Sequence, residues 1–244
     1  MVFVREFMIA LSFISRIPVN MKGYQLDAGD IRKVPKYFSI VGYLIGSIYL
    51  SGATLSRLIP NVGGSLLVKV ISIAAGFYLF DLFHFDGLLD MFDGFLNQSN
   101  AERRLEIMSK GNVGPFAVFY GTLYVIVFYQ LFSLVPPYAL LFSSVFGRLT
   151  MTLLILFSKP AKNKGLGALL YPTSKRNLVG ILFTLPLIFL SYVGYVLSLL
   201  IAISVAIVVN SISERKIGGV TGDVIGGTCL IAQLFILLAF SIFD

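Results

Sequence analysis

Long runs of apolar residues, separated by short polar segments, set the pattern of this chain. The runs lie near residues 38–58, 62–83, 115–135, 138–158, 178–193, 195–211 and 224–243. Most approach the roughly 20 residues that an α-helix needs to cross a hydrocarbon core of about 30 Å. Because backbone polar groups must be paired within lipid, the runs predict helices and not open sheets. The expected fold is all-α, a polytopic integral membrane helical bundle of about seven transmembrane helices in one domain, residues 1–244.

The first eighteen residues differ from the later runs. A short apolar stretch from Phe7 to Ile14 lies between the charged pair Arg5 and Glu6 on one side and Arg16 on the other. It lacks the small-residue cleavage site of a signal peptide. We expect an N-terminal helix that lies in the membrane interface, with a short transmembrane segment as the alternative.

Composition and charge agree with a lipid bilayer as the surroundings. Hydrophobic residues make up 57% of the chain and charged residues 13%, and the net charge is +7. The cations gather in every second loop, at Lys22–Lys36, Arg103–Lys110, Lys159–Arg176 and Arg215–Lys216. This alternation predicts basic loops that face the cytoplasm in a cell membrane, and it explains the positive charge without a nucleic-acid partner.

A row of acids follows the second run. Asp86, Asp90 and Asp93 are spaced four and then three residues apart, which places them on one face of a helix. Three neighbouring carboxylates repel one another unless they share a cation, and their hard oxygen atoms suit Mg²⁺, Mn²⁺ or Ca²⁺. We therefore predict a metal site here, with Asp93 as an alternative general base acting on an alcohol.

A glycine-rich segment, residues 218–226, carries another acid, Asp223. Glycine permits the close approach of backbone to a ligand, so Asp223 is expected to reach the same metal. The alternative is a helix N-cap for the run that begins at Val224. The seven-span register places this segment, the acidic row and the basic loops on one side of the membrane, where the chemistry should occur.

Three further features could contact a substrate. Arg148 lies near the middle of the fourth run, where a charge is costly, and its partner is expected to be an aspartate or a substrate phosphate. His84, the only histidine, could bind substrate or orient a carboxylate, and a structural role is an equal alternative. The loop with Lys164, Gly165 and Gly167 can cradle a phosphate through its backbone N–H groups.

These residues together indicate a metal-dependent membrane enzyme that acts on phosphorylated substrates. An ion-coupled transporter could also use acids within the membrane. Transport, however, favours acids near the bilayer midplane in two related halves, and the chain has no second copy of the acidic row.

The order of the motifs resembles the cobalamin synthase family, the adenosylcobinamide-GDP ribazoletransferases. The resemblance rests on Ser15–Pro18, His84–Gly94, Arg104–Met108, Gly147–Arg148, Lys164–Ala168 and Gly218–Asp223. It implies a Mg²⁺-dependent transferase in which a hydroxyl of α-ribazole, or of its 5′-phosphate, attacks the cobinamide-linked phosphate of adenosylcobinamide-GDP. GMP leaves, and adenosylcobalamin or its 5′-phosphate forms. A homo-oligomer is compatible with the resemblance.

Carried over by position, the family assigns three sets of residues. The expected metal ligands are Asp86, Asp90 and Asp223. Asp93, Asp90 and Arg148 are expected in catalysis. The expected substrate contacts are His84, Lys164, Gly165, Gly167 and Gly222.

Two observations limit the resemblance. Family members commonly have small residues before the histidine, whereas this chain has Asp81, an extra acid or a partner for Arg148. The CDP-alcohol phosphotransferases of phospholipid synthesis also carry an Asp-Gly row and are the competing enzyme family. They need Ala-Arg where this chain has Leu89-Asp90, so we rank them below cobalamin synthase.

Overall fold

The computed structural model describes residues 2–20 and 27–243 of the chain, so Lys22 of the first basic loop lies outside the described residues. The helices run in the order α1 (Val2–Ile14), α2 (Ala28–Ile31), η1 (Val34–Tyr37), α3 (Phe38–Leu58), α4 (Val62–Gly76), η2 (Phe77–Asp81), α5 (Leu82–Leu96), α6 (Ala101–Ser109), α7 (Pro115–Leu134), α8 (Pro137–Phe157), η3 (Leu166–Leu170), η4 (Lys175–Phe189), α9 (Tyr192–Ile217) and α10 (Gly222–Phe243). No strand forms in these two ranges, which confirms the all-α prediction.

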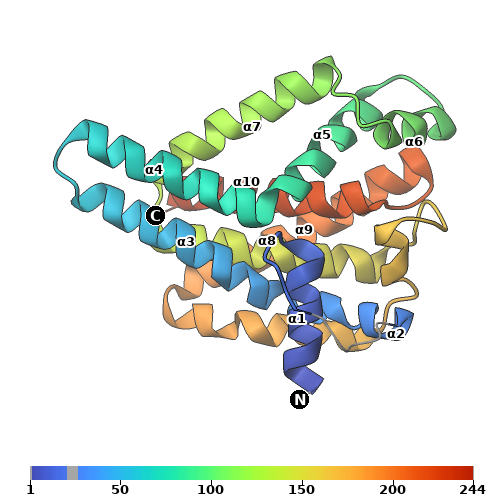
Figure 1. Cartoon of the computed structure of the whole chain (residues 1–244), viewed down its shortest axis with the longest axis horizontal. Coiled ribbons are helices and arrows are strands. Elements are labelled where there is room, and N and C mark those ends of the chain that lie inside the picture. The colour runs from blue at the N-terminus through green and yellow to red at the C-terminus, as the bar shows by residue number, and fades with distance from the viewer. Residues whose placement is uncertain (1, 21–26, 244) are drawn as a thin grey trace.

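Within the described residues, six helices are long and apolar enough to cross a membrane. They cover Ala28–Leu58, Val62–Leu96, Pro115–Leu134, Pro137–Phe157, Tyr192–Ile217 and Gly222–Phe243. In Figure 1 the long helices lie side by side, whereas α1 crosses them. The helix α1 is not among the six, and its crossing direction agrees with the interfacial helix expected for the N-terminal segment.

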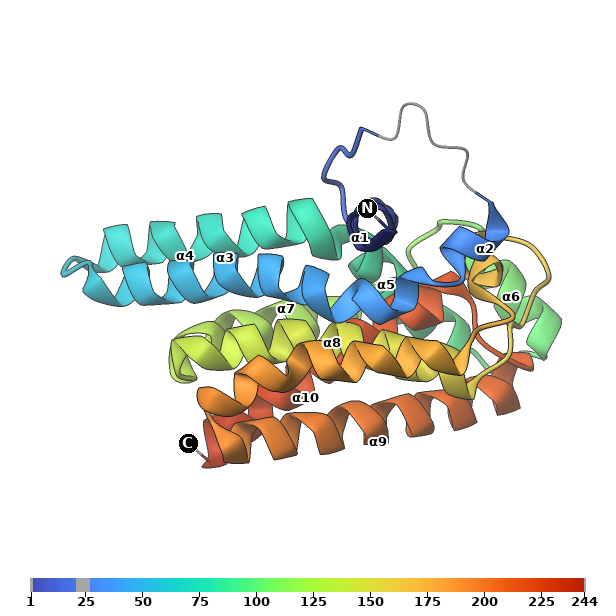
Figure 2. The same ribbon diagram turned by 90° about the horizontal axis from the view of Figure 1, so that it is seen from below.

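The run near residues 178–193 does not form the expected α-helical span. Residues Lys175–Phe189 form the 3₁₀-helix η4, which contains Pro186, and a proline cannot donate the backbone hydrogen bond of an α-helix interior. At a rise of about 2.0 Å per residue, these 15 residues still extend about 30 Å. Figure 2 shows this orange segment beside α8, and it returns the chain so that α8 and α9 end at the same end of the bundle.

The helix α8 forms the centre of the bundle. Its side chains from Ala139 to Ile155 are all buried, and it packs against α3, α9 and α10. On α3, a Cβ atom at Gly42 would lie 2.6 Å from the Val145 Cα atom, so only glycine permits this approach. Gly46, one helical turn further on, is equally close to Leu141, so the two glycines let α3 and α8 pack closely together.

The second span bends where α4 meets α5. One π-helical turn, η2, joins the two helices, and the Leu82 N–H bonds to the Phe77 carbonyl, five residues earlier. Such turns insert a residue into a helix and often occur at functional sites. The Leu79 carbonyl in this turn accepts a 2.7 Å hydrogen bond from the Arg16 N–H, which ties the end of the N-terminal segment to the bend. The bend directs α5, with its acids, across α10 (Figure 1).

Candidate functional site

Glycines bring α5 and α10 into direct backbone contact. A Cβ atom at Gly87 would lie 2.6 Å from the Asp223 carbonyl oxygen, and one at Gly227 would lie 3.1 Å from the Leu88 Cα atom. A Cβ atom at Gly226 would lie 3.1 Å from the His84 Cα atom. These positions have no room for a larger side chain unless the helices move apart. The contact therefore places the acidic row of α5 beside Asp223 at the start of α10.

The loop after α8 and the loop before α10 meet next to the contact between α5 and α10. The Ala161 N–H bonds to the Val220 carbonyl at 2.8 Å, and the Val220 N–H bonds to the Lys159 carbonyl at 2.9 Å. A Cβ atom at Gly167 would lie 2.6 Å from the Gly222 nitrogen. Gly165 has a φ of 101°, a conformation that residues with a side chain rarely adopt. The predicted phosphate loop and the glycine-rich segment thus lie against each other, although they are far apart in sequence.

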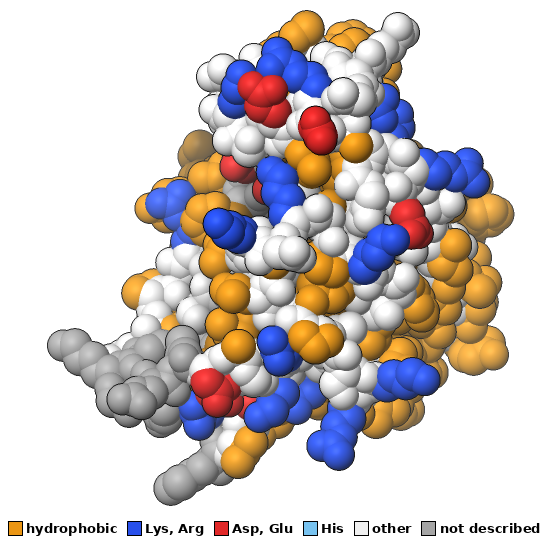
Figure 3. Space-filling view, turned by 90° about the vertical axis from the view of Figure 1, so that its right-hand side faces the viewer, with side chains coloured by type: hydrophobic (Ala, Val, Ile, Leu, Met, Phe, Trp, Pro, Cys, Tyr) orange, Lys and Arg blue, Asp and Glu red, His pale blue; other side chains and the backbone are white. Residues whose placement is uncertain are grey.

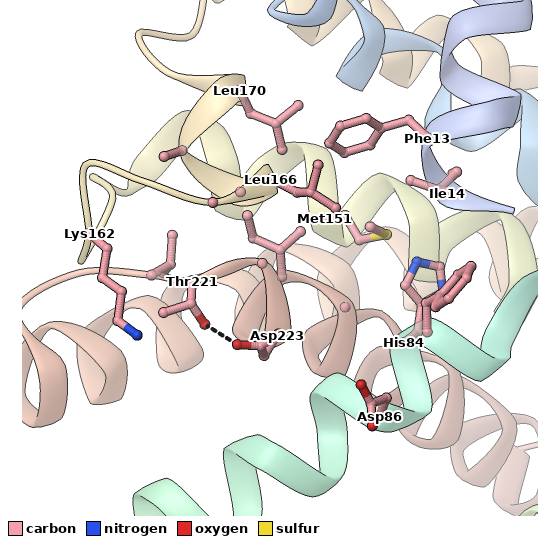
Figure 4. Close-up of a pocket in the computed structure, with 18 of the residues that line it drawn as sticks. Phe13, Ile14, His84, Asp86, Met151, Lys162, Leu166, Leu170, Thr221 and Asp223 are labelled. Carbon is pink, nitrogen blue, oxygen red and sulfur yellow. Dashed lines mark hydrogen bonds between the residues drawn. The ribbon is translucent and has the colours of Figure 1, made fainter. Parts of the chain in front are cut away.

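A cavity of about 600 Å³ lies between these loops, α5, α10 and α1. Its polar lining side chains are Ser12, His84, Asp86, Lys162, Lys164, Thr221 and Asp223. Its apolar lining includes Phe13, Ile14, Phe38, Met151, Leu166 and Leu170. Figure 4 shows Lys162 and His84 toward opposite ends of the cavity, with Asp223 and Asp86 between them. The volume suits one ligand, or one end of a larger ligand, with both charged and apolar parts.

The lysines that line the cavity belong to the loop after α8, at the basic end of the molecule (Figure 1). Figure 3 shows Lys and Arg side chains spread over this face, with acidic side chains among them. The cations of α6 and of the loop after α8 belong to this end (Figure 1). The prediction that the basic loops and the acidic row share one side of the membrane is consistent with this arrangement.

The carboxylates near the cavity repel one another. The negative charges of Asp86, Asp93 and Asp223 all repel a negative charge on the half-buried Asp90. Thr221 Oγ1 donates a 3.2 Å hydrogen bond to Asp223, and Lys162 is the nearby cation. Oxygen donors of this kind fit Mg²⁺. Within residues 2–20 and 27–243, however, no three Asp, Glu, His or Cys side chains are gathered closely enough to hold an ion as they stand, so binding would require side-chain rotation.

Asp93 does not line this cavity, and its side chain binds the N-terminus of α7. Its carboxylate accepts hydrogen bonds from the Gly114 N–H at 2.6 Å and the Ala117 N–H at 3.0 Å. These groups belong to the first turn of α7, where a negative charge is favourable. The expectation that Asp93 is a general base is therefore not supported, because both carboxylate oxygens already serve the N-terminus of α7.

Replacing Asp93 tests this structural role. Asp93→Asn is expected to lower the free energy of unfolding by about 1 kcal/mol, because the amide can no longer accept both N–H groups. Turnover at saturating substrate should stay near the unsubstituted level. Denaturant unfolding in detergent and a rate assay on the same preparation measure the two effects. Slow turnover with unchanged stability would restore the general-base assignment.

Arg148 also lies away from the cavity. The side chain is fully buried, and its Nη2 donates a 2.6 Å hydrogen bond to Asp81 Oδ1, which is equally buried. The prediction that Arg148 has an aspartate partner is confirmed, whereas the expected phosphate contact is not supported. The physical reason is the cost of an unpaired charge in a low-dielectric interior, which the ion pair offsets.

Most of the other predicted site residues come together. His84, Asp86, Lys164, Gly165, Gly167, Gly222 and Asp223 all line the cavity. Asp90 does not line the cavity, but it lies close enough to the lining residues Asp86 and Asp223 for their charges to repel its own. The apolar wall was not foreseen, because Phe13, Phe38 and Met151 belong to the same residue types that face lipid elsewhere. The motif Ser15–Pro18, directly after α1, and the apolar stretch Phe7–Ile14 were the sequence signals near Phe13.

Comparisons with known proteins agree on one family. The family model described as cobalamin-5-phosphate synthase matches residues 6–241. The chain is 53% identical to the adenosylcobinamide-GDP ribazoletransferase of Fervidobacterium nodosum, over 96% of this chain and 95% of that protein. It is 49% identical to the protein of the same name from Thermosipho africanus, over 96% and 97% of the two chains. No solved structure matches. The chain therefore belongs to the cobalamin-5-phosphate synthase family.

Proposed function

We propose that this protein is an adenosylcobinamide-GDP ribazoletransferase of the cell membrane, with its active site facing the cytoplasm. It would join adenosylcobinamide-GDP to α-ribazole or α-ribazole 5′-phosphate, forming adenosylcobalamin or its 5′-phosphate and releasing GMP. The observation that carries the proposal is the cavity itself, where acids, lysines and two glycine loops meet at the basic end of a membrane bundle. The names of the relatives support the same reaction.

The residues at the cavity would have different roles in phosphoryl transfer. Lys162 and Lys164 would contact phosphate oxygens, and the backbone of the loop at Gly165–Gly167 would approach them closely. Asp86, Asp90 and Asp223 would hold Mg²⁺, which supplies charge neutralisation at the pyrophosphate. Such a transfer depends mainly on positioning and electrostatic stabilisation, and this mixed set of charges provides both.

The apolar wall adds a place for the uncharged part of a substrate. A cavity of about 600 Å³ is in the range of sites that enclose one molecule of ordinary ligand size. A corrinoid joined to a nucleotide is much larger, so part of that donor would remain outside. Phe13 and Ile14 of α1 would then face the enclosed part, opposite Lys162 (Figure 4).

The decisive experiment measures GMP release by the purified protein in detergent or liposomes. Adenosylcobinamide-GDP and α-ribazole are supplied together and singly, with and without Mg²⁺. Release is expected only with both substrates and the metal. Release of CMP from CDP-diacylglycerol and an alcohol would instead indicate the phospholipid-type transferase. A folded protein that is inactive in both assays and that carries an ion gradient-dependent flux would be a transporter.

A further inference from the structure

A buried polar cluster adjoins the cavity behind His84. Its centre is Asp81, the last residue of the π-helical turn η2, whose side chain is fully buried. Arg148 Nη2 lies 2.6 Å from Asp81 Oδ1, and the Tyr49 hydroxyl donates a 3.2 Å hydrogen bond to Asp81 Oδ2. The Nδ1 atom of His84 lies 3.3 Å from Asp81 Oδ1. Four helical elements thus meet at one carboxylate.

This cluster determines which ring nitrogen of His84 carries a proton. Asp81 is paired with the guanidinium of Arg148, so its carboxylate is ionised and can only accept hydrogen bonds. A hydrogen bond across the 3.3 Å between Nδ1 and Asp81 Oδ1 therefore requires a proton on that nitrogen. In a neutral imidazole the other nitrogen, Nε2, then has a free lone pair.

The ring is also fixed in place by its neighbours. On one side, a Cβ atom at Gly226 would lie 3.2 Å from His84 Cδ2, so α10 packs directly on the imidazole. On the other side is Asp81, which does not line the cavity, whereas His84 does. With Nδ1 turned toward Asp81, Nε2 is the nitrogen available to the cavity.

We propose that Asp81 is a positioning residue that holds His84 with Nε2 as a hydrogen-bond acceptor for a hydroxyl group of the substrate. The proposal rests on the proposed function only in that the substrate carries such a hydroxyl. A lone pair suits an O–H donor and disfavours a phosphate, which at neutral pH offers acceptor oxygens. The lysine at the opposite end of the cavity suits the phosphate instead (Figure 4). The two ends of the cavity would therefore orient the hydroxyl and the phosphate relative to each other.

The tautomer can be measured without any activity, because His84 is the only histidine in the chain. ¹⁵N-histidine labelling of the full chain in detergent gives one imidazole spectrum, recorded at a pH of about 9, well above the ordinary histidine pKa of about 6.5. The proton is expected on Nδ1. Asp81→Ala, which removes the acceptor that faces Nδ1, should shift the population toward the Nε2–H form. Tyr49→Phe, which removes only the hydrogen bond to the other carboxylate oxygen, should not. An Nε2–H tautomer in the unsubstituted protein overturns the proposal, even if Asp81→Ala fails to fold.

Kinetics then separate positioning from general structural support. Asp81→Ala, which removes the acceptor for Nδ1–H, is expected to lower kcat by about ten- to hundredfold with little change in KM for the nucleotide donor, by analogy with outer partners of metal-bound histidines. In a His84→Ala background, the same substitution should lower kcat no further, since Asp81 acts through the imidazole. Losses that multiply in the double variant would overturn the proposal. A protein with the expected tautomer but no GMP release would instead contradict the proposed function.

Discussion

Asp86→Asn and Asp90→Asn are each expected to lower the rate of GMP release by about a thousandfold or more, while the protein stays folded in the membrane. A bound metal ion stabilises transition-state charge by several kcal/mol, and each 1.36 kcal/mol corresponds to tenfold in rate. Loss of one carboxylate should also raise the Mg²⁺ concentration needed for any remaining activity. The assay is GMP release over a Mg²⁺ titration, with unfolding followed on the same samples.

Stability distinguishes this effect from misfolding. Asp90 is repelled by the neighbouring carboxylates. In the absence of Mg²⁺, Asp90→Asn removes this repulsion, so the unfolding temperature should stay unchanged or rise. Glu102→Gln provides a matched control, because Glu102 is an exposed acid in the first turn of α6. It should keep full activity. If both aspartate variants retained the activity of the unsubstituted protein, the metal assignment would be wrong.

Gly87→Ala is expected to lower both stability and turnover. The new methyl carbon would lie 2.6 Å from the Asp223 carbonyl oxygen, so α5 and α10 must separate. Overpacking of this kind costs about 1–3 kcal/mol, and a displacement of about 1 Å between reacting groups can cost about a hundredfold in rate. Denaturant unfolding and GMP release measure the two losses.

A second glycine in the same span serves as the control for this substitution. Gly63 lies in the first turn of α4, and a Cβ atom there would meet only Asn61 Oδ1, at 3.8 Å. Gly63→Ala should therefore be neutral or slightly stabilising, as alanine favours a helix. A fully active and stable Gly87→Ala protein would show that the close contact of α5 and α10 is not needed for the site.

The helix count shows where hydrophobic pattern alone was insufficient. In the part of the chain that the structure describes, six of the apolar runs correspond to helical spans, although the second continues to Leu96 and the sixth to Ile217, beyond the expected ends. The run near residues 178–193 has the same apolar character but contains Pro186, and it forms a 3₁₀-helix against α3, α8 and α9. Hydropathy predicts burial in lipid or protein, whereas the helix type depends on local backbone donors and on packing.

The acidic row shows a similar limit. Helical spacing predicted that Asp86, Asp90 and Asp93 share a face, and their mutual repulsion agrees with it. Spacing within one helix could not show that α7 begins beside Asp93, because that N-terminus lies 21 residues further along the chain. The role of an acid depends on the groups that surround it in space as well as on its neighbours in sequence.

By itself, the sequence determined the membrane setting, the helical class, the family, and the polar segments that line the cavity. These follow from local properties. The apolar runs have the length of membrane spans, and charged side chains beside or within such spans are energetically costly, so they mark functional segments. Only the tertiary structure decided that Arg148 pairs with Asp81, that Asp93 serves α7, and that α1 supplies an apolar wall. The physical reason is that a buried charge takes the partner that packing brings within a few ångströms, and packing is decided by contacts between distant helices.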